Sequence, residues 1–103
     1  MNISDILGCG SDPVLSIPNL AEAAQTALDF MSRKDPNVYL ASAWDWGGEY
    51  VMFIFKRNPS DTYGFYQVSV ELDKPDRVLR YDGGLAATLQ VPEVYATLLF
   101  SLD

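Results

Sequence analysis

Few residues in this chain could carry out chemistry. Asp45 and Glu49 flank a double glycine, and a carboxylate pair can act as general acid and general base when its separation is fixed and one pKa is raised. The sequence supplies neither condition, so we interpret both residues as solvated turn acids. Cys9 lies between two glycines with no general base identifiable near it, and we interpret it as an ordinary connector residue rather than a reactive thiol.

The chain contains no histidine. This removes the commonest general base, a histidine-assisted serine or cysteine nucleophile, and nearly all transition-metal sites. Asp73, Asp76 and Asp82 do not follow the spacing of a calcium loop, and neither double glycine lies in a phosphate-loop pattern. We therefore expect no enzymatic activity, no metal and no cofactor.

Charge and size restrict the partners that the protein can have. The chain has 103 residues, and 7 Lys and Arg against 14 Asp and Glu give a formal net charge of −7. Phosphates repel such a charge, so nucleic acids and anionic membranes are disfavoured and a basic protein is favoured. The single cysteine allows no intrachain disulfide, and we find neither a signal peptide nor an apolar span, so we expect a cytoplasmic protein.

The first predicted element is a helix. Asn19 and Glu22 have the spacing of a capping box, with Asn19 as the N-cap. Apolar residues then recur at helical spacing until Asp35-Pro36, so the sequence predicts a helix over 20–34. Before it, residues 1–18 are expected to form a connector, with one helical turn at 2–7.

From residue 38 onward the apolar period changes to two. Stretches rich in β-branched and aromatic residues, each bounded by turn residues, predict four antiparallel strands over 38–46, 50–57, 63–72 and 77–81. Gly47-Gly48 fits a two-residue hairpin turn and 58–62 a longer loop. After the second double glycine, Pro92 could begin a helix, although 92–102 could equally be a final strand.

These elements predict one domain, 1–103, of the α+β class. It would consist of the connector 1–18, a core at 19–82 in which one N-terminal helix packs on a four-stranded antiparallel meander, and a C-terminal helix or strand within 83–103.

Pairing across the predicted turns divides the sheet into two faces, although a slip of one residue would exchange the faces of a strand. The first is apolar and should pack on the helix: Ala41, Ala43, Tyr50, Met52, Ile54, Tyr66, Val68, Val70 and Leu72. The second is mixed, aromatic and acidic: Leu40, Ser42, Trp44, Trp46, Glu49, Val51, Phe53, Phe55, Gln67, Ser69 and Glu71. Unpaired carboxylates side by side are costly to bury, so we expect at least one tryptophan on this second face to be partly exposed.

Two interpretations of the second face stay open. It could be a small second core, covered by residues 1–18 and the C-terminal element. It could instead be a recognition surface, on which Trp44 and Trp46 anchor a partner and an acidic rim steers it. In that case the partner-binding residues are Trp44, Trp46, Asp45, Glu49, Phe53, Gln67 and Glu71.

The capped helix, the hairpin WDWGGEYVMFIF and the segment YGFYQVSVELDKPDRV resemble small bacterial immunity proteins that neutralise polymorphic or contact-dependent-inhibition toxins. The resemblance is to those with a cystatin/NTF2-like helix and meander, and it covers about residues 19–82. It implies a non-enzymatic protein that inhibits a basic, nuclease-type toxin. Peptidase-propeptide-like (PepSY) domains share much of the pattern, but the Asp-x-x-x-Gly on which they usually turn lacks its glycine here. No functional residue transfers from the resemblance.

Two other functions stay open from the sequence. One is a small ligand-binding domain of cystatin or NTF2 type, with a pocket between helix and sheet lined by Phe30, Trp44, Tyr50 and Tyr66. The other is a phage-encoded acidic mimic of DNA. The oligomeric state is open as well, because an open sheet face can pair with a second copy of the chain.

Overall fold

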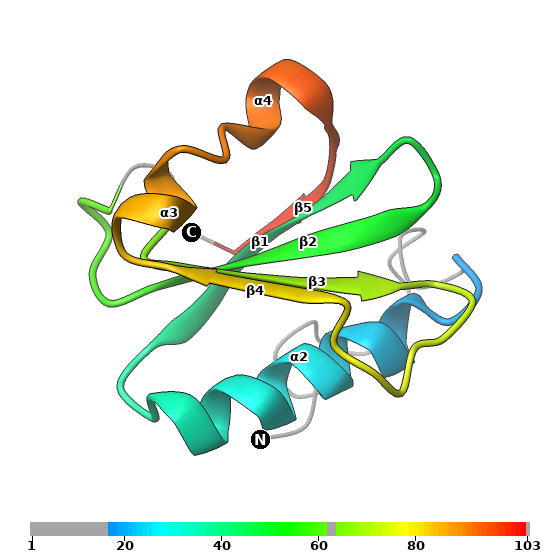
Figure 1. The fold of residues 1–103 in the computed structure, drawn as a ribbon, viewed down its shortest axis with the longest axis horizontal. Helices are drawn as coiled ribbons and strands as arrows, with labels where there is room; N and C mark the ends of the chain where they lie inside the picture. Colours follow the sequence, from blue (N-terminus) through cyan, green and yellow to red (C-terminus); the bar gives the residue numbers. More distant parts are fainter. Residues whose placement is uncertain (1–16, 62–63, 103) are drawn as a thin grey trace.

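The computed structural model describes residues 17–61 and 64–102. The predicted helical turn at 2–7, most of the connector, Cys9, and residues 62–63 at the junction of the predicted loop and third strand lie outside the described residues. In the described part, one long helix packs on a five-stranded antiparallel sheet, as Figure 1 shows. The protein is therefore of the α+β class, as predicted.

Helix α2, Leu20–Lys34, has the predicted bounds. One stripe of the helix is buried against the sheet, and its alanines allow close approach: Leu20, Ala23, Ala24, Ala27, Leu28 and Met31. The predicted capping box is wrong. Asn19 precedes the helix in a left-handed conformation, φ 66°, and makes no side-chain cap. Its side-chain amide instead donates a hydrogen bond to the carbonyl oxygen of Leu72, 2.8 Å away.

The sheet contains β1 (Tyr39–Trp46), β2 (Tyr50–Lys56), β3 (Tyr66–Glu71), β4 (Arg80–Gly83) and β5 (Thr97–Ser101) in the order β4-β3-β2-β1-β5. The fourth strand thus begins later than the predicted 77 and includes residues expected to form a turn. Residues 92–102 contain both alternatives, since α4 (Pro92–Tyr95) is one helical turn and β5 pairs antiparallel with β1. With α3 (Leu85–Thr88), α4 lies on the opposite side of the sheet from α2 (Figure 1).

The register of β2 differs from the prediction by one residue on each side. A turn forms at the double glycine, with positive φ at Gly47 and Gly48 and a hydrogen bond from the Glu49 N–H to the Trp46 carbonyl oxygen, but the loop spans 47–49 and not the two predicted residues. Glu49 therefore takes no place in the ladder, and Tyr50 pairs with Trp46. On the other side Tyr50 pairs with Glu71 rather than with Val70.

Because the two shifts cancel, β1 and β3 keep their predicted faces relative to each other. Only β2 is turned over, so that its two faces are exchanged. Val51, Phe53 and Phe55 therefore pack on α2, whereas Tyr50, Met52 and Ile54 face the other way. Leu40 also packs on α2, because a register shift between Leu40 and Ser42 reorients the start of β1. The alternation predicted within β3 is confirmed, with Val68 and Val70 in the core under the helix.

A polar and aromatic cluster joins the end of α2 to the sheet. The Arg57 guanidinium lies 3.1 Å from the Asp35 carboxylate and 4.1 Å from the ring centroid of Phe65. The Tyr66 hydroxyl donates to the same Asp35 oxygen at 3.1 Å. Tyr66 also stacks on Tyr81, whose phenol has its pKa raised by burial. This cluster fixes the end of the sheet far from the Gly47-Gly48 turn.

None of the helices within 17–61 and 64–102 has the combined length and hydropathy needed to cross a lipid bilayer.

Candidate interaction surface

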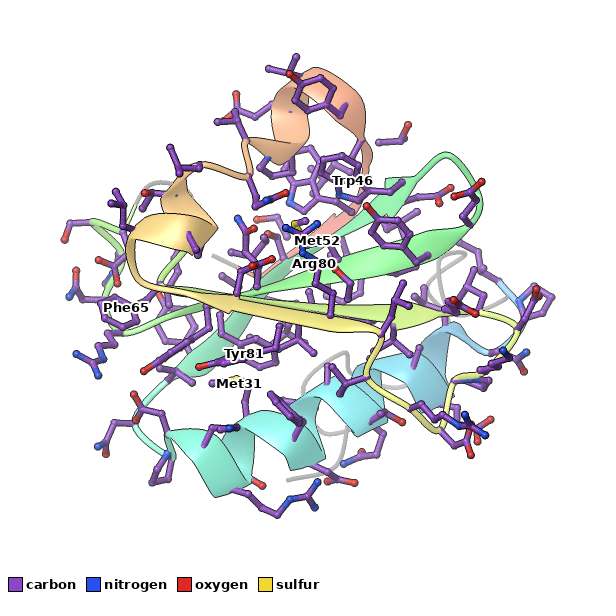
Figure 2. All side chains as sticks on the ribbon, viewed as in Figure 1. Met31, Trp46, Met52, Phe65, Arg80 and Tyr81 are labelled. Carbon is purple, nitrogen blue, oxygen red and sulfur yellow. The ribbon has the colours of Figure 1, made fainter. Side chains whose placement is uncertain are left out.

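Both tryptophans lie on the face of the sheet opposite α2. They alternate along β1 with Ala43, which is buried in the core under the helix. Both are half-buried, which confirms that at least one is partly exposed, and the Trp44 Nε1–H donates to the Ser42 hydroxyl oxygen at 3.0 Å. Figure 2 shows Trp46 and Met52 on the α4 side of the sheet and Met31 and Tyr81 on the α2 side.

The centre of this face is buried beneath residues 84–96, which we call the cover. Met52, Ile54, Gln67 and Ser69 are almost fully buried there. From the cover, Ala87 and Pro92 are buried as well, and the Gln67 Nε2–H donates to the carbonyl oxygen of Gln90 at 3.0 Å. The centre of the face is therefore a second small core, closed by the C-terminal element.

At the hairpin tip the face ends in a stack of three aromatic rings. Trp46 lies between Tyr50, with centroids 5.9 Å apart and planes 9° from parallel, and Tyr95, at 5.7 Å and 26°. Tyr95 comes from α4 and is 69% exposed. The indole Nε1 of Trp46 is buried and has no acceptor among the described residues. Tyr95 is thus the exposed outer ring of the stack, and it packs on Trp46 of β1, which in turn packs on Tyr50 of β2.

Three carboxylates lie beside the residues of this aromatic stack. Glu49 is exposed in the turn next to Tyr50, and Glu71 pairs with Tyr50 across the strands. Glu93 is exposed in the same turn of helix as Tyr95. Asp45, which pairs with Val51 on the α2 face of the hairpin, accepts a hydrogen bond from the Gly48 N–H at 2.9 Å. The ion pairs observed among the described residues, Arg57–Asp35 and Arg80–Asp82, involve none of these four. The end of the face is thus aromatic at its centre and negative at its rim.

The structure brings together five of the seven predicted partner-binding residues. Trp44, Trp46, Asp45, Glu49 and Glu71 belong to this end of the sheet. Gln67 belongs to the buried centre beneath the cover, and the expectation for Phe53 is wrong, because the inverted β2 places it fully buried against α2.

Sequence reasoning missed Tyr50, Tyr95 and Glu93. Tyr50 was assigned to the helix side through the mistaken register. For the other two, the sequence leaves the conformation of 92–102 open, and the signal that could identify them is an aromatic residue two positions after an acid, Glu93-Val94-Tyr95.

The pocket predicted for a ligand-binding domain does not form from its predicted residues. Phe30 and Tyr66 pack against the core on the α2 side, whereas Trp44 and Tyr50 lie on the opposite face. A cavity of about 110 Å³ does lie beside α2, lined in part by Met31, Leu40 and Phe55, but typical ligand pockets measure roughly 300–1,000 Å³. In the described residues, no three acidic or cysteine side chains gather as a metal site would require.

Comparison of the chain with protein-family models, with curated proteins and with solved structures finds no match in any of the three.

Proposed function

We propose that this protein is a non-enzymatic inhibitor that binds a basic protein partner, in the way that an immunity protein binds a toxin. The observation that carries the proposal is the aromatic stack at the hairpin tip, where Tyr95, 69% exposed, lies on Trp46 with the carboxylates of Glu49, Glu71 and Glu93 nearby. Aromatic side chains are enriched among the residues that dominate binding energies. A rim of one charge sign selects a partner of the opposite sign.

The two parts of the surface have different roles in this proposal. Tyr95 and Trp46 bury apolar area at the centre of the contact and set the dissociation rate. Asp45, Glu49, Glu71 and Glu93 add to the field of a chain whose net charge is −7, and this field accelerates association with a cation. Fast, salt-sensitive association with a slow dissociation rate is the behaviour that an inhibitor of a toxin requires.

The direct test uses the product of the reading frame next to the gene of this protein. Cells that express that product should survive when this protein is co-expressed, and the two purified proteins should bind. Tyr95→Ala should weaken binding by about 2 kcal/mol, roughly thirtyfold. Loss of the stack on Trp46 should lower the free energy of unfolding by only about 0.5–1.5 kcal/mol, so the variant stays folded. Leu79→Ala is the matched control, since Leu79 is 49% exposed and lies outside the stack and the cover.

Three outcomes would contradict the proposal: a neighbouring product with no toxicity, no rescue of the cells, or equal binding by the Tyr95→Ala and Leu79→Ala proteins. A mimic of DNA would be favoured instead if this protein competed with a DNA duplex for the same partner. In that case replacing Glu49, Glu71 or Glu93 by glutamine should abolish the competition, whereas Tyr95→Ala should leave it unchanged.

A further inference from the structure

The cover exposes several of its large apolar side chains. Leu85 is 77% exposed, Leu89 73% and Val94 69%, whereas Ala87 is fully buried. A surface segment ordinarily has the opposite pattern, since its large apolar residues gain most from burial. Exposed apolar side chains gathered in one segment mark an interaction site. We refer to Leu85, Leu89 and Val94 as the apolar ridge.

The three residues of the ridge lie on the same side of the sheet. Leu85 and Leu89 are four residues apart, so they lie on the same side of α3 and its C-terminal turn. Val94 lies in α4, and Figure 1 shows α3 and α4 on the same side of the sheet, away from α2. The Gln67–Gln90 hydrogen bond and the Trp46–Tyr95 stack hold the cover on the sheet, so the ridge is already positioned before any partner arrives.

Charge distinguishes the occupant of this ridge from the basic partner proposed above. Glu93 is the only charged residue between Gly83 and Leu102. A partner selected by positive charge gains little from such a surface, whereas two copies of a chain with net charge −7 repel one another and can meet only where carboxylates are sparse. Interfaces between identical subunits are also more apolar than those with transient partners.

We propose that the apolar ridge is the contact between two copies of this chain, related by a two-fold axis that places the ridge of each copy against that of the other. The contact uses residues outside the aromatic stack, and so it does not depend on the proposed function. In the dimer the two covers face each other and both α2 helices lie on the outside.

Sedimentation equilibrium of the purified protein, from micromolar to millimolar concentration, tests this proposal. The wild-type protein should shift from monomer to dimer over this range. Leu89→Glu should raise the dissociation constant of the dimer about tenfold or more, because it places like charges against each other within an apolar contact. Leu79→Glu is the matched control and should stay within twofold of the wild type.

Circular dichroism and thermal melting should show both variants folded, since both side chains are substantially exposed. If Leu89→Glu nevertheless unfolds, Leu85→Ser provides a milder change on the same ridge and should also weaken the dimer. A wild-type protein that stays monomeric at every concentration overturns the proposal, as does a dimer that neither Leu89→Glu nor Leu85→Ser weakens. A monomer whose Leu89→Glu variant loses a basic partner assigns the ridge to that partner and equally overturns it.

Discussion

Gln67, at the buried centre of the sheet, donates a hydrogen bond from Nε2 to the carbonyl oxygen of Gln90 over 3.0 Å. The bond joins β3 to the middle of the cover, between α3 and α4. Through it a polar side chain lies buried among apolar neighbours, and the cover is fixed at a point between its two short helices. Buried polar groups are expected to be bonded in this way.

Replacing Gln67 by methionine should loosen the cover. The change keeps the length of the side chain but removes the donor, so the Gln90 carbonyl oxygen loses its partner and the free energy of unfolding should fall by about 1–3 kcal/mol. Amide hydrogen exchange within 84–96 should accelerate more than exchange in β3. Gln90→Ala is the control, because the acceptor is a backbone atom that the substitution retains. Equal effects of the two changes would show that the bond does not hold the cover.

Gly64→Ala should destabilise the protein more than Gly48→Ala. Both glycines have positive φ, 84° and 78°, which is unfavourable for alanine by about 1–2 kcal/mol. At Gly48 an added Cβ meets open space, but at Gly64 it collides with Cγ2 of the buried Ile54. Overpacking of this kind costs roughly a further 1–3 kcal/mol. Urea unfolding of the two variants measures the difference, and equal midpoints would contradict the packing described at Gly64.

Asp35→Asn should change how stability depends on pH. The Asn37 backbone N–H donates to the Asp35 carboxylate, Arg57 and Tyr66 donate to it as well, and together these bonds lower the pKa of Asp35 below its ordinary value of 3.8, against the opposing effect of partial burial. A lowered folded-state pKa stabilises the protein above the pKa of the unfolded chain, and the stabilisation is lost as pH falls through the folded value.

The Asp35→Asn protein should therefore be less stable than the wild type at neutral pH, and the two stabilities should converge in acid. Urea unfolding at a series of pH values measures this difference. Asp76→Asn, at an exposed loop position, should give a curve parallel to that of the wild type over the whole range. A wild-type advantage over Asp35→Asn that persists unchanged below the folded pKa would contradict this account.

Phe53→Ala tests how much the core beneath α2 contributes to stability. Because Phe53 is fully buried between α2 and its strand neighbours, the change should lower the free energy of unfolding by about 3–5 kcal/mol. Val94→Ala, at a largely exposed position, should change it by less than about 0.5 kcal/mol. A small loss for Phe53→Ala would contradict the burial of this ring against α2. Chemical denaturation followed by circular dichroism suits both variants.

Prediction of the fold succeeded where a local pattern decides the structure. Helix 20–34 has a periodic apolar stripe and a clear stop at Asp35-Pro36, and β3 alternates so strictly that its two faces need no partner for their assignment. In β2 the run from Val51 to Phe55 is apolar at every position, so both faces are equally suited to burial. One unpaired residue at Glu49 then decides which side meets α2, and no local pattern identifies that residue.

Prediction of the candidate surface was limited by the same features. Trp44, Trp46 and the nearby carboxylates were identified because their residue types are distinctive and the two register errors cancel between β1 and β3. Tyr95 depends on how α4 folds back onto β1, a contact between residues far apart in sequence. Its stacking partner therefore could not be inferred from spacing alone.

The extra residue at Glu49 lies in the loop of the hairpin and takes no place in the ladder. A surface turn with two glycines looks suitable for insertion of a tag or for deletion in a combinatorial library. Removing Glu49 would leave Gly47-Gly48 as a two-residue turn with Tyr50 still opposite Trp46, so Phe53 would keep its place against α2. Libraries that diversify this tip can therefore vary its length, but a residue at position 49 that entered the ladder opposite Trp46 would exchange the two faces of the central strand.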